Sequence, residues 1–427
     1  AMDGSRVVAL TSWTYNAGTG SAYRAVPAAS QDPRPQLQTL IVNPANDNAS
    51  PYGWHEQVGP DGQMRRFTET IGNNVYAQEN RANRSAAEQE ANLEAAGQRP
   101  TGGEELVFDF PFDSSAADVA ANQNASITNL FYLTNYLHDL FYEYGFDEEA
   151  GNFQESNGDR GGQGGDALLA NVLDAGAMND ADMTVPPDGE RPRMRIHVYN
   201  YTRPARDGAF ANDIVAHEYM HGVTTRLAGG PANADCLAEG QSRGMAEGWS
   251  DFAALWLQAA ANATGANEPP PSSPVRHAPG HGLNMGTYVN PRGLRLYDYS
   301  TDLEYNPLSY ALMNDTYWQQ PHRVGMLWAE MLYEMYWRLV EGSGLGATAR
   351  VEQADLRWGN TLALQLVIDG LKLQPCRPTL LTARDAILLA EQLRTHGQHR
   401  CAIWAAFAKR GLGVDAQPVI TNATTSF

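Results

Sequence analysis

The pattern of apolar and polar positions changes about halfway along the 427-residue chain. In the first half, short apolar runs bounded by turn residues predict strands and long loops, with strands at 7–12, 37–42, 75–77, 106–108 and 193–199. One stretch in this half, 126–144, repeats its apolar residues at helical spacing and stops at Gly145. The glycine-rich segment 158–165 lacks the ending of a phosphate-binding loop, which favours a turn.

After about residue 207 the pattern becomes helical. It predicts helices at 213–227, 245–261, 323–340, 354–370, 382–394 and 401–409. The last three are amphipathic, which is typical of structural helices. We therefore expect an α+β fold of two lobes. The β-rich N-terminal lobe spans 1–206, with an edge strand near 193–200, and the mainly helical C-terminal lobe spans 207–427.

Composition narrows the class of protein. Hydrophobic residues make up 43% and charged residues 19%, which is typical of a globular chain. Acidic residues outnumber basic ones by 49 to 30, and the net charge of −19 repels phosphate backbones and anionic lipids. We expect no nucleic-acid partner, and no apolar run is long enough to span a membrane. The start at Ala1 lacks a basic and apolar leader, so we expect a secreted, processed form.

The three cysteines, Cys236, Cys376 and Cys401, are too few for a disulfide scaffold and wrongly spaced for a structural zinc site. Cys376 and Cys401 bracket a predicted helix. We expect a disulfide between them and one free thiol. Three buried thiols are the alternative.

The strongest chemical signal is the segment NDIVAHEYMHGVTTR at 212–226. His217 and His221 are four residues apart, so both rings leave one face of a helix and can converge on one ion. Glu218 lies beside them. In this HExxH pattern the histidines bind zinc and the glutamate is the general base. The alternative is a pair of surface histidines.

A catalytic zinc ion takes three protein ligands and keeps one open position. The segment GMAEGWSD at 244–251 supplies a candidate, because Glu247 and Asp251 again share one helix face. Glu247 would bind the ion, and Asp251 would accept the second ring N–H of a ligand histidine. The alternative is that both carboxylates are favourable charges at a helix N-terminus.

Together these two segments resemble the fungalysin family of secreted zinc metalloendopeptidases. The likeness covers nearly the whole chain, with further similar stretches at 47–56, 72–80, 128–154, 375–387 and 406–413. It implies a thermolysin-like fold and one catalytic Zn²⁺ held by His217, His221 and Glu247. It also implies that Glu218 is the catalytic base, and that a propeptide is cleaved from the mature unit.

The resemblance extends to other candidate site residues. His322 resembles the histidine that steadies the tetrahedral intermediate, although it could be an ordinary helix-start residue. Asp315 would orient it, and Tyr310 or Tyr317 would add a hydroxyl donor. Arg295 resembles the arginine that binds a substrate carbonyl, with a surface salt bridge as the alternative.

Two positions depart from the pattern. Asn179, Asp180 and Ala181 resemble an Asn-Asn-Ala run that holds the substrate backbone, but a carboxylate at the middle position cannot donate a hydrogen bond. Ala246 stands where thermolysin has an asparagine, which leaves the partner of His221 unassigned.

Calcium is a further possible cofactor. Asp147, Glu148 and Glu149 could bind it, as in thermolysin relatives, but their spacing is not that of an EF-hand and a solvated charge run fits better. His277 and His281 are separated by Pro279 and Gly280, which break any helix, so we expect loop residues there.

The expected function is that of a secreted, monomeric zinc endopeptidase acting on internal bonds of protein or peptide substrates. A peptide- or matrix-binding module with a degraded metal site is a rival. The intact Glu218 argues against it, because a metal clamp needs no base. The third hypothesis is a zinc hydrolase of small peptides.

Overall fold

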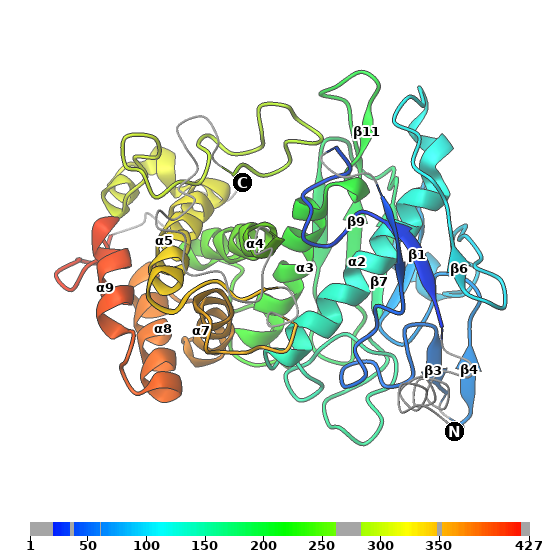
Figure 1. The fold of residues 1–427 in the computed structure, drawn as a ribbon, viewed down its shortest axis with the longest axis horizontal. Coiled ribbons are helices and arrows are strands. Elements are labelled where there is room, and N and C mark those ends of the chain that lie inside the picture. Colours follow the sequence, from blue (N-terminus) through cyan, green and yellow to red (C-terminus); the bar gives the residue numbers. More distant parts are fainter. Residues whose placement is uncertain (1–19, 35–37, 60, 262–282, 348–351, 420–427) are drawn as a thin grey trace, which may run out of the picture.

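The computed structural model describes residues 20–34, 38–59, 61–261, 283–347 and 352–419. The strand predicted at 7–12 and the pair His277 and His281 lie outside these ranges. Strands gather in the N-terminal half and long helices in the C-terminal half, which confirms the α+β class (Figure 1).

The largest sheet in the described chain has four strands in the order β5 (Val75–Glu79), β7 (Leu168–Val172), β9 (Arg193–Ile196) and β8 (Ala181–Thr184). The first three are parallel, and β8 runs antiparallel to β9. Our prediction of an edge strand near 193–200 is wrong. Met194 and Ile196 of β9 are fully buried between neighbours, whereas the buried β5 and the half-exposed β8 form the two edges.

Shorter strands complete the N-terminal half. β1 (Ala22–Ala25) lies between β2 (Thr39–Val42) and β6 (Val107–Phe108). Two hairpins pair β3 (Glu56–Val58) with β4 (Met64–Arg66), and β10 (Val198–Tyr199) with β11 (Arg206–Asp207). The helices here are the short α1 (Ala86–Glu90) and the long α2 (Gln123–Glu143).

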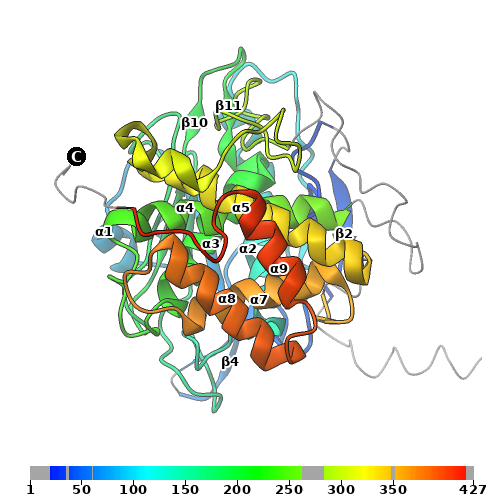
Figure 2. The same cartoon turned by 90° about the vertical axis from the view of Figure 1, so that its left-hand side faces the viewer.

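The C-terminal half holds the six helices predicted after residue 207. They are α3 (Asn212–Leu227), α4 (Gly240–Ala261), α5 (Pro321–Ser343), α7 (Gly359–Leu373), α8 (Leu380–Thr395) and α9 (Arg400–Lys409). Seen from the helical side, α8 and α9 lie in front of α3 and α4 (Figure 2). Within the described ranges, no helix combines the length and apolar character needed to cross a membrane.

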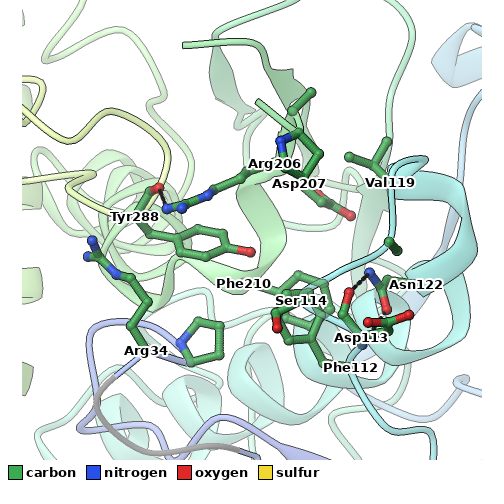
Figure 3. A pocket seen from close by; sticks show the side chains of 14 residues that line it. Arg34, Phe112, Asp113, Ser114, Val119, Asn122, Arg206, Asp207, Phe210 and Tyr288 are labelled. Atoms are coloured by element: carbon green, nitrogen blue, oxygen red, sulfur yellow. Dashed lines mark hydrogen bonds between the residues drawn. The ribbon is translucent and has the colours of Figure 1, made fainter. Parts of the chain in front are cut away.

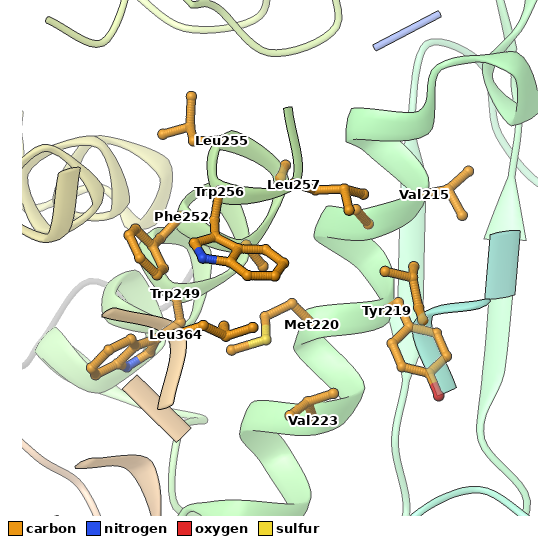
Figure 4. Close-up of a cluster of buried hydrophobic side chains, with 14 of the residues drawn as sticks. Val215, Tyr219, Met220, Val223, Trp249, Phe252, Leu255, Trp256, Leu257 and Leu364 are labelled. Atoms are coloured by element: carbon orange, nitrogen blue, oxygen red, sulfur yellow. The ribbon is translucent and has the colours of Figure 1, made fainter. Parts of the chain in front are cut away.

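The core is continuous between the two halves, and α3 runs through its centre. On one side, Met220 and Val223 face Trp249 and Trp256 of α4 (Figure 4). On the other side, Tyr219 stacks on Phe141 of α2 with ring centroids 6.0 Å apart. Nearly all of α3 is buried, so its polar side chains need partners inside the protein.

The C-terminal end of α3 carries a buried cation. The Arg226 guanidinium is fully buried and donates hydrogen bonds to the backbone carbonyls of Gly151, Pro186 and Glu190 and to the carboxylates of Asp166 and Asp188. The Arg226 Nη1 to Asp166 Oδ2 distance is 2.8 Å. Arg226 therefore joins the loops before β7 and after β8 to the end of α3.

The disulfide joins Cys236 to Cys376, with a Cα–Cα distance of 4.6 Å, and Cys401 is an exposed free thiol. Our prediction of a Cys376–Cys401 bridge is wrong. The two residues flank α8, and a helix of 16 residues is about 24 Å long, whereas bridged Cα atoms lie within about 7 Å. The loop that carries Cys376 instead meets the loop between α3 and α4, where Arg377 N donates to Cys236 O.

Candidate metal centre

The centre is built on α3 and α4. Asp213 in the first turn of α3 and Arg226 in its last turn suit the helix dipole, and Gly229 and Gly230 follow with positive φ angles of 83° and 88°. These features define the two ends of α3. His217 and His221 are four residues apart on it and project from one face. Their Nε2 atoms lie 3.1 Å apart.

Glu247 reaches the same point from α4. Its Oε2 atom lies 3.3 Å from His217 Nε2 and 3.7 Å from His221 Nε2. Atoms bound tetrahedrally to one zinc ion at about 2.0–2.2 Å lie about 3.3–3.6 Å from one another. Glu247 Oε2 is also buried without a hydrogen-bond donor among the described residues. Both observations fit a divalent cation held by these three side chains.

Asp251 lies behind His217. Its Oδ1 atom is 2.8 Å from His217 Nδ1, so it fixes the ring with the proton on Nδ1 and the lone pair of Nε2 toward Glu247. Arg295 donates two hydrogen bonds to the same carboxylate, of 2.6 and 2.7 Å, and the Tyr299 hydroxyl donates a third. Burial alone would raise the pKa of Asp251. The charges of Arg295 and His217 and their hydrogen bonds outweigh it and hold this pKa well below its usual value.

Glu218 follows His217 on α3 and is 6% exposed. Burial raises the pKa of its carboxyl above the ordinary value, while His217 and His221 oppose that shift. The carboxyl also lies within electrostatic range of Asp182 on β8, the edge strand beside α3. A carboxylate in this place can exchange a proton with a group bound between the sheet edge and the histidines.

His322 lies in the first turn of α5 and reaches the centre from a third helix. Its Nε2 atom is 3.4 Å from Glu247 Oε2, and its side chain is 55% exposed. The structure does not bring Asp315 to it. The Asp315 carboxylate caps the turn Thr316–Gln319 by accepting from Tyr317 N, and Gln320 lies 3.2 Å from His322 Nδ1 instead.

The segment Asn179–Asp180–Ala181 lies at the start of the edge strand β8. The Asn179 side chain exchanges hydrogen bonds with Asn200, of 2.9 and 2.8 Å. The Asp180 carboxylate accepts from the backbone N–H of Ala181, so it folds back onto its own strand. The run is thus placed at the start of the edge strand β8, which contacts α3, the helix of Glu218.

Two other predicted substrate residues have different contacts. The Tyr310 hydroxyl donates to Gln417 O near the C-terminal end, and its backbone N–H donates to Arg410 O. These contacts tie it to the segment after α9 and do not direct it to the centre. The Arg295 guanidinium pairs with buried Asp251, so the alternative of a surface salt bridge is wrong, and the substrate contact stays a prediction. Sequence analysis missed Tyr299, although it lies four residues after Arg295 in the segment RGLRLYDYS.

No calcium cluster is found in the described part of the chain. There, His217, His221 and Glu247 are the one group of three or more acidic, histidine or cysteine side chains whose donor atoms converge. Of the acidic run at 147–149, Glu148 pairs with Arg160 at 3.4 Å.

A separate cavity of about 290 Å³ lies between the β10–β11 hairpin, the start of α2 and the loop of Tyr288 (Figure 3). Its walls include Phe112, Val119 and Phe210, and Arg206 stacks over the Tyr288 ring at 4.7 Å. None of the residues of the metal centre lines it.

Two imidazoles one helical turn apart, a carboxylate from the next helix and a glutamate beside the first imidazole define the class of HExxH metal centres. The chain belongs to the fungalysin metallopeptidase family, whose model matches residues 22–416.

Comparison with individual proteins agrees with this membership. The chain is 39% identical over 422 residues to "Extracellular metalloproteinase 2" of Phaeosphaeria nodorum, covering 98% of this chain and 61% of the relative. It is 40% identical over 410 residues to "Extracellular metalloproteinase 3" of Trichophyton tonsurans, covering 92% and 58%. The chain thus spans about three fifths of the length of these relatives. The extracellular location expected from the sequence agrees with their names.

Among solved structures, the chain is similar to the "Precursor of Protealysin, Metalloproteinase from Serratia proteamaculans". The TM-score is 0.38 at 13% identity, covering 80% of this chain and 86% of that one.

Proposed function

We propose that the protein is a secreted zinc-dependent endopeptidase that hydrolyses internal peptide bonds of proteins. The observation that carries the proposal is the convergence of His217 Nε2, His221 Nε2 and Glu247 Oε2 within 4.8 Å of one another, with Glu218 alongside. Catalytic zinc sites use three such ligands and leave a fourth position open.

His217, His221 and Glu247 would hold the ion. When bound, zinc at such a site lowers the pKa of water toward 7 and polarises a carbonyl group. Asp251 keeps His217 in the tautomer that binds a metal through Nε2, and Arg295 and Tyr299 keep Asp251 in place.

Glu218 is the proposed general base. Its carboxylate takes a proton from the attacking water and returns it to the leaving amine, so no covalent acyl-enzyme forms. Burial, which raises its pKa, makes it a better proton acceptor than an exposed glutamate would be. His322 is the proposed donor to the developing oxyanion, because its Nε2 atom faces Glu247 across the centre and its side chain is open to solvent.

The substrate backbone is proposed to pair with β8 by strand addition, since this strand is a sheet edge next to α3. Ala181 and Asn179 would contribute backbone and side-chain hydrogen bonds there. Arg295 supports Asp251 through Nε and Nη2, and it remains the proposed donor to a substrate carbonyl, because a guanidinium has further N–H groups to donate. Monomeric action and inhibition by a propeptide before activation remain part of the proposal.

The test is casein hydrolysis by the purified chain with and without a chelator, repeated on Glu218→Gln. General base removal lowers kcat by roughly 10²–10⁴-fold, and we expect zinc to remain bound one to one in the variant. Glu105→Gln is the matched control, because Glu105 is exposed in the turn before β6 and has no role in the proposed site. Full casein hydrolysis by Glu218→Gln would remove the proposed base from the mechanism. Cleavage of dipeptides alone would favour a small-peptide hydrolase.

A further inference from the structure

The centre depends on how closely α4 and α5 approach, because Glu247 lies on α4 and His322 on α5. The two helices lie side by side (Figure 1). At their contact, Gly248 of α4 faces Gly325 of α5. Gly325 lies three residues after His322 and Gly248 directly after Glu247, so the glycine contact adjoins both site residues.

There is no room for a side chain at Gly325. A Cβ atom there would lie 2.5 Å from Glu247 Cβ, 3.0 Å from Gly248 N and 3.1 Å from Glu247 C. These atoms belong to the backbone or adjoin it, so they cannot give way by a change of rotamer. On the facing side, a Cβ at Gly248 would lie 2.7 Å from Gly325 O and 2.8 Å from Trp328 Cβ.

The side chains around the two glycines hold α4 and α5 in one position relative to each other. Trp249 and Trp328 are fully buried, and their rings meet edge to face with centroids 4.9 Å apart. Carbon atoms in contact lie about 3.5–4.0 Å apart, so a methyl group at position 325 would displace the Glu247 backbone by about 1 Å. A metal site tolerates about 0.2 Å in its ligand distances. His217 and His221 lie on α3 and would not follow this shift.

Helix stability does not explain the glycine at position 325. Glycine inside a helix costs about 0.5–1 kcal/mol relative to alanine, and position 325 is buried within α5. A Cβ atom added at Gly342 on the same helix would meet no other atom within 4 Å, so that position tolerates alanine.

We propose that Gly325 is a positioning residue of the metal centre, whose missing side chain lets α5 hold Glu247 at ligand distance from the two imidazoles and bring His322 to the same carboxylate. This inference rests on the proposed zinc site. It predicts that one uncharged methyl group, which offers no ligand atom, weakens metal binding.

The experiment compares Gly325→Ala and Gly248→Ala with two controls. Gly342→Ala adds a methyl group to the same helix in open space. Gly370→Ala crowds a different helix pair, because its Cβ would lie 2.9 Å from Ile387 Cγ1. Zinc affinity is measured by competition with a chelator, Co²⁺ absorption reports the ligand geometry, and a thermal melt reports the fold.

We expect a zinc affinity about 10–100-fold lower in both variants of the α4–α5 contact, with an altered Co²⁺ spectrum, and an unchanged affinity in both controls. Zinc binding by Gly325→Ala within twofold of Gly342→Ala would overturn the inference, as would loss of the folded state in Gly325→Ala alone. A comparable loss of affinity in Gly370→Ala would also overturn it, by showing that general destabilisation is the cause. A wild-type chain that binds no zinc would instead refute the proposed function.

Discussion

At the scale of single residues, Asp251 supports the centre without being one of its proposed ligands. Its two oxygens accept hydrogen bonds from His217, Arg295 and Tyr299 at once. Because its pKa is held low, it remains a carboxylate that only accepts. The orientation of His217 therefore depends on this one negative charge.

We predict that Asp251→Asn lowers zinc affinity by about 10–100-fold, since an amide has one acceptor oxygen for three donors. Chelator competition measures the change. Asp315→Asn is the control, because Asp315 caps a turn outside the centre and should leave zinc affinity unchanged. An Asp251→Asn variant that binds zinc as tightly as wild type would contradict the supporting role.

Asp207 gives a prediction about pH. Burial raises its pKa from 3.8 to about 6, although the Ser126 hydroxyl and Ala209 N–H stabilise its charge. The folded state thus binds its proton more tightly than the unfolded chain, and stability falls as pH rises from 3.8 to about 6.

Compared with wild type, Asp207→Asn should therefore gain up to about 3 kcal/mol in free energy of unfolding between pH 4 and pH 7, from about 1.4 kcal/mol per unit of pKa. Urea unfolding of both proteins at each pH measures this difference. If the free energies of unfolding of the two proteins changed equally between pH 4 and pH 7, Asp207 would not titrate as described.

At the scale of elements, α5 and α9 are joined by a buried charge cluster. The Arg410 guanidinium, which follows α9, lies 2.8 Å from carboxylate oxygens of both Glu330 and Glu334 on α5. Burial raises the pKa of Glu330 to about 8, and Arg410 opposes that shift. Lys409 also pairs with Glu334 at 2.8 Å, so two cations face the two acidic side chains.

We predict that Arg410→Leu lowers the free energy of unfolding by about 3–5 kcal/mol, because it removes the ion-pair partner of buried Glu330 and leaves Glu334 with Lys409 alone. The loss should be larger at pH 8 than at pH 5, where the Glu330 carboxyl is protonated. Denaturant unfolding at both pH values is the measurement. Arg338→Leu removes an exposed pair with Glu341 and should cost less than about 1 kcal/mol.

The helices could be predicted from the sequence because their apolar repeat extends over three or more turns. The strands were harder to predict from the sequence. The runs at 75–77 and 106–108 were found as β5 and β6, but β7 and β8, of five and four residues, were not predicted, because apolar runs this short give a weak periodic signal. The order of strands in the sheet depends on pairings distant in sequence, which is why β9 was mistaken for the edge.

The site residues, too, fall into those that the sequence predicted and those that it did not. His217, Glu218, His221, Glu247 and Asp251 could be predicted, because spacing on a helix determines which side chains share a face. Asp315 and Tyr310 lie among short turns between residues 300 and 320, where spacing says nothing about direction. The contact between Gly248 and Gly325 could not be predicted from the sequence, because it depends on how α4 packs against α5.

At the scale of the whole molecule, the Cys236–Cys376 bridge closes a loop across 140 residues that includes α4, α5 and α7. A cross-link of this span restricts the unfolded chain. We predict that Cys236→Ala with Cys376→Ala lowers the free energy of unfolding by about 2–5 kcal/mol, measured by denaturant titration. Cys401→Ala should have little effect, since this thiol is exposed and unbridged. Equal stability of the double variant and wild type would contradict the prediction.

Arg226 affects what can be concluded when a chelator inactivates the protein. A positive charge that is part of the polypeptide cannot be extracted by EDTA or exchanged for another ion, yet here it neutralises Asp166 and Asp188 and gathers three carbonyl groups at the end of α3. That region should keep its shape in metal-free buffer. Inactivation by a chelating agent would then report on the loss of the catalytic ion itself and not on collapse of the helix that carries its ligands.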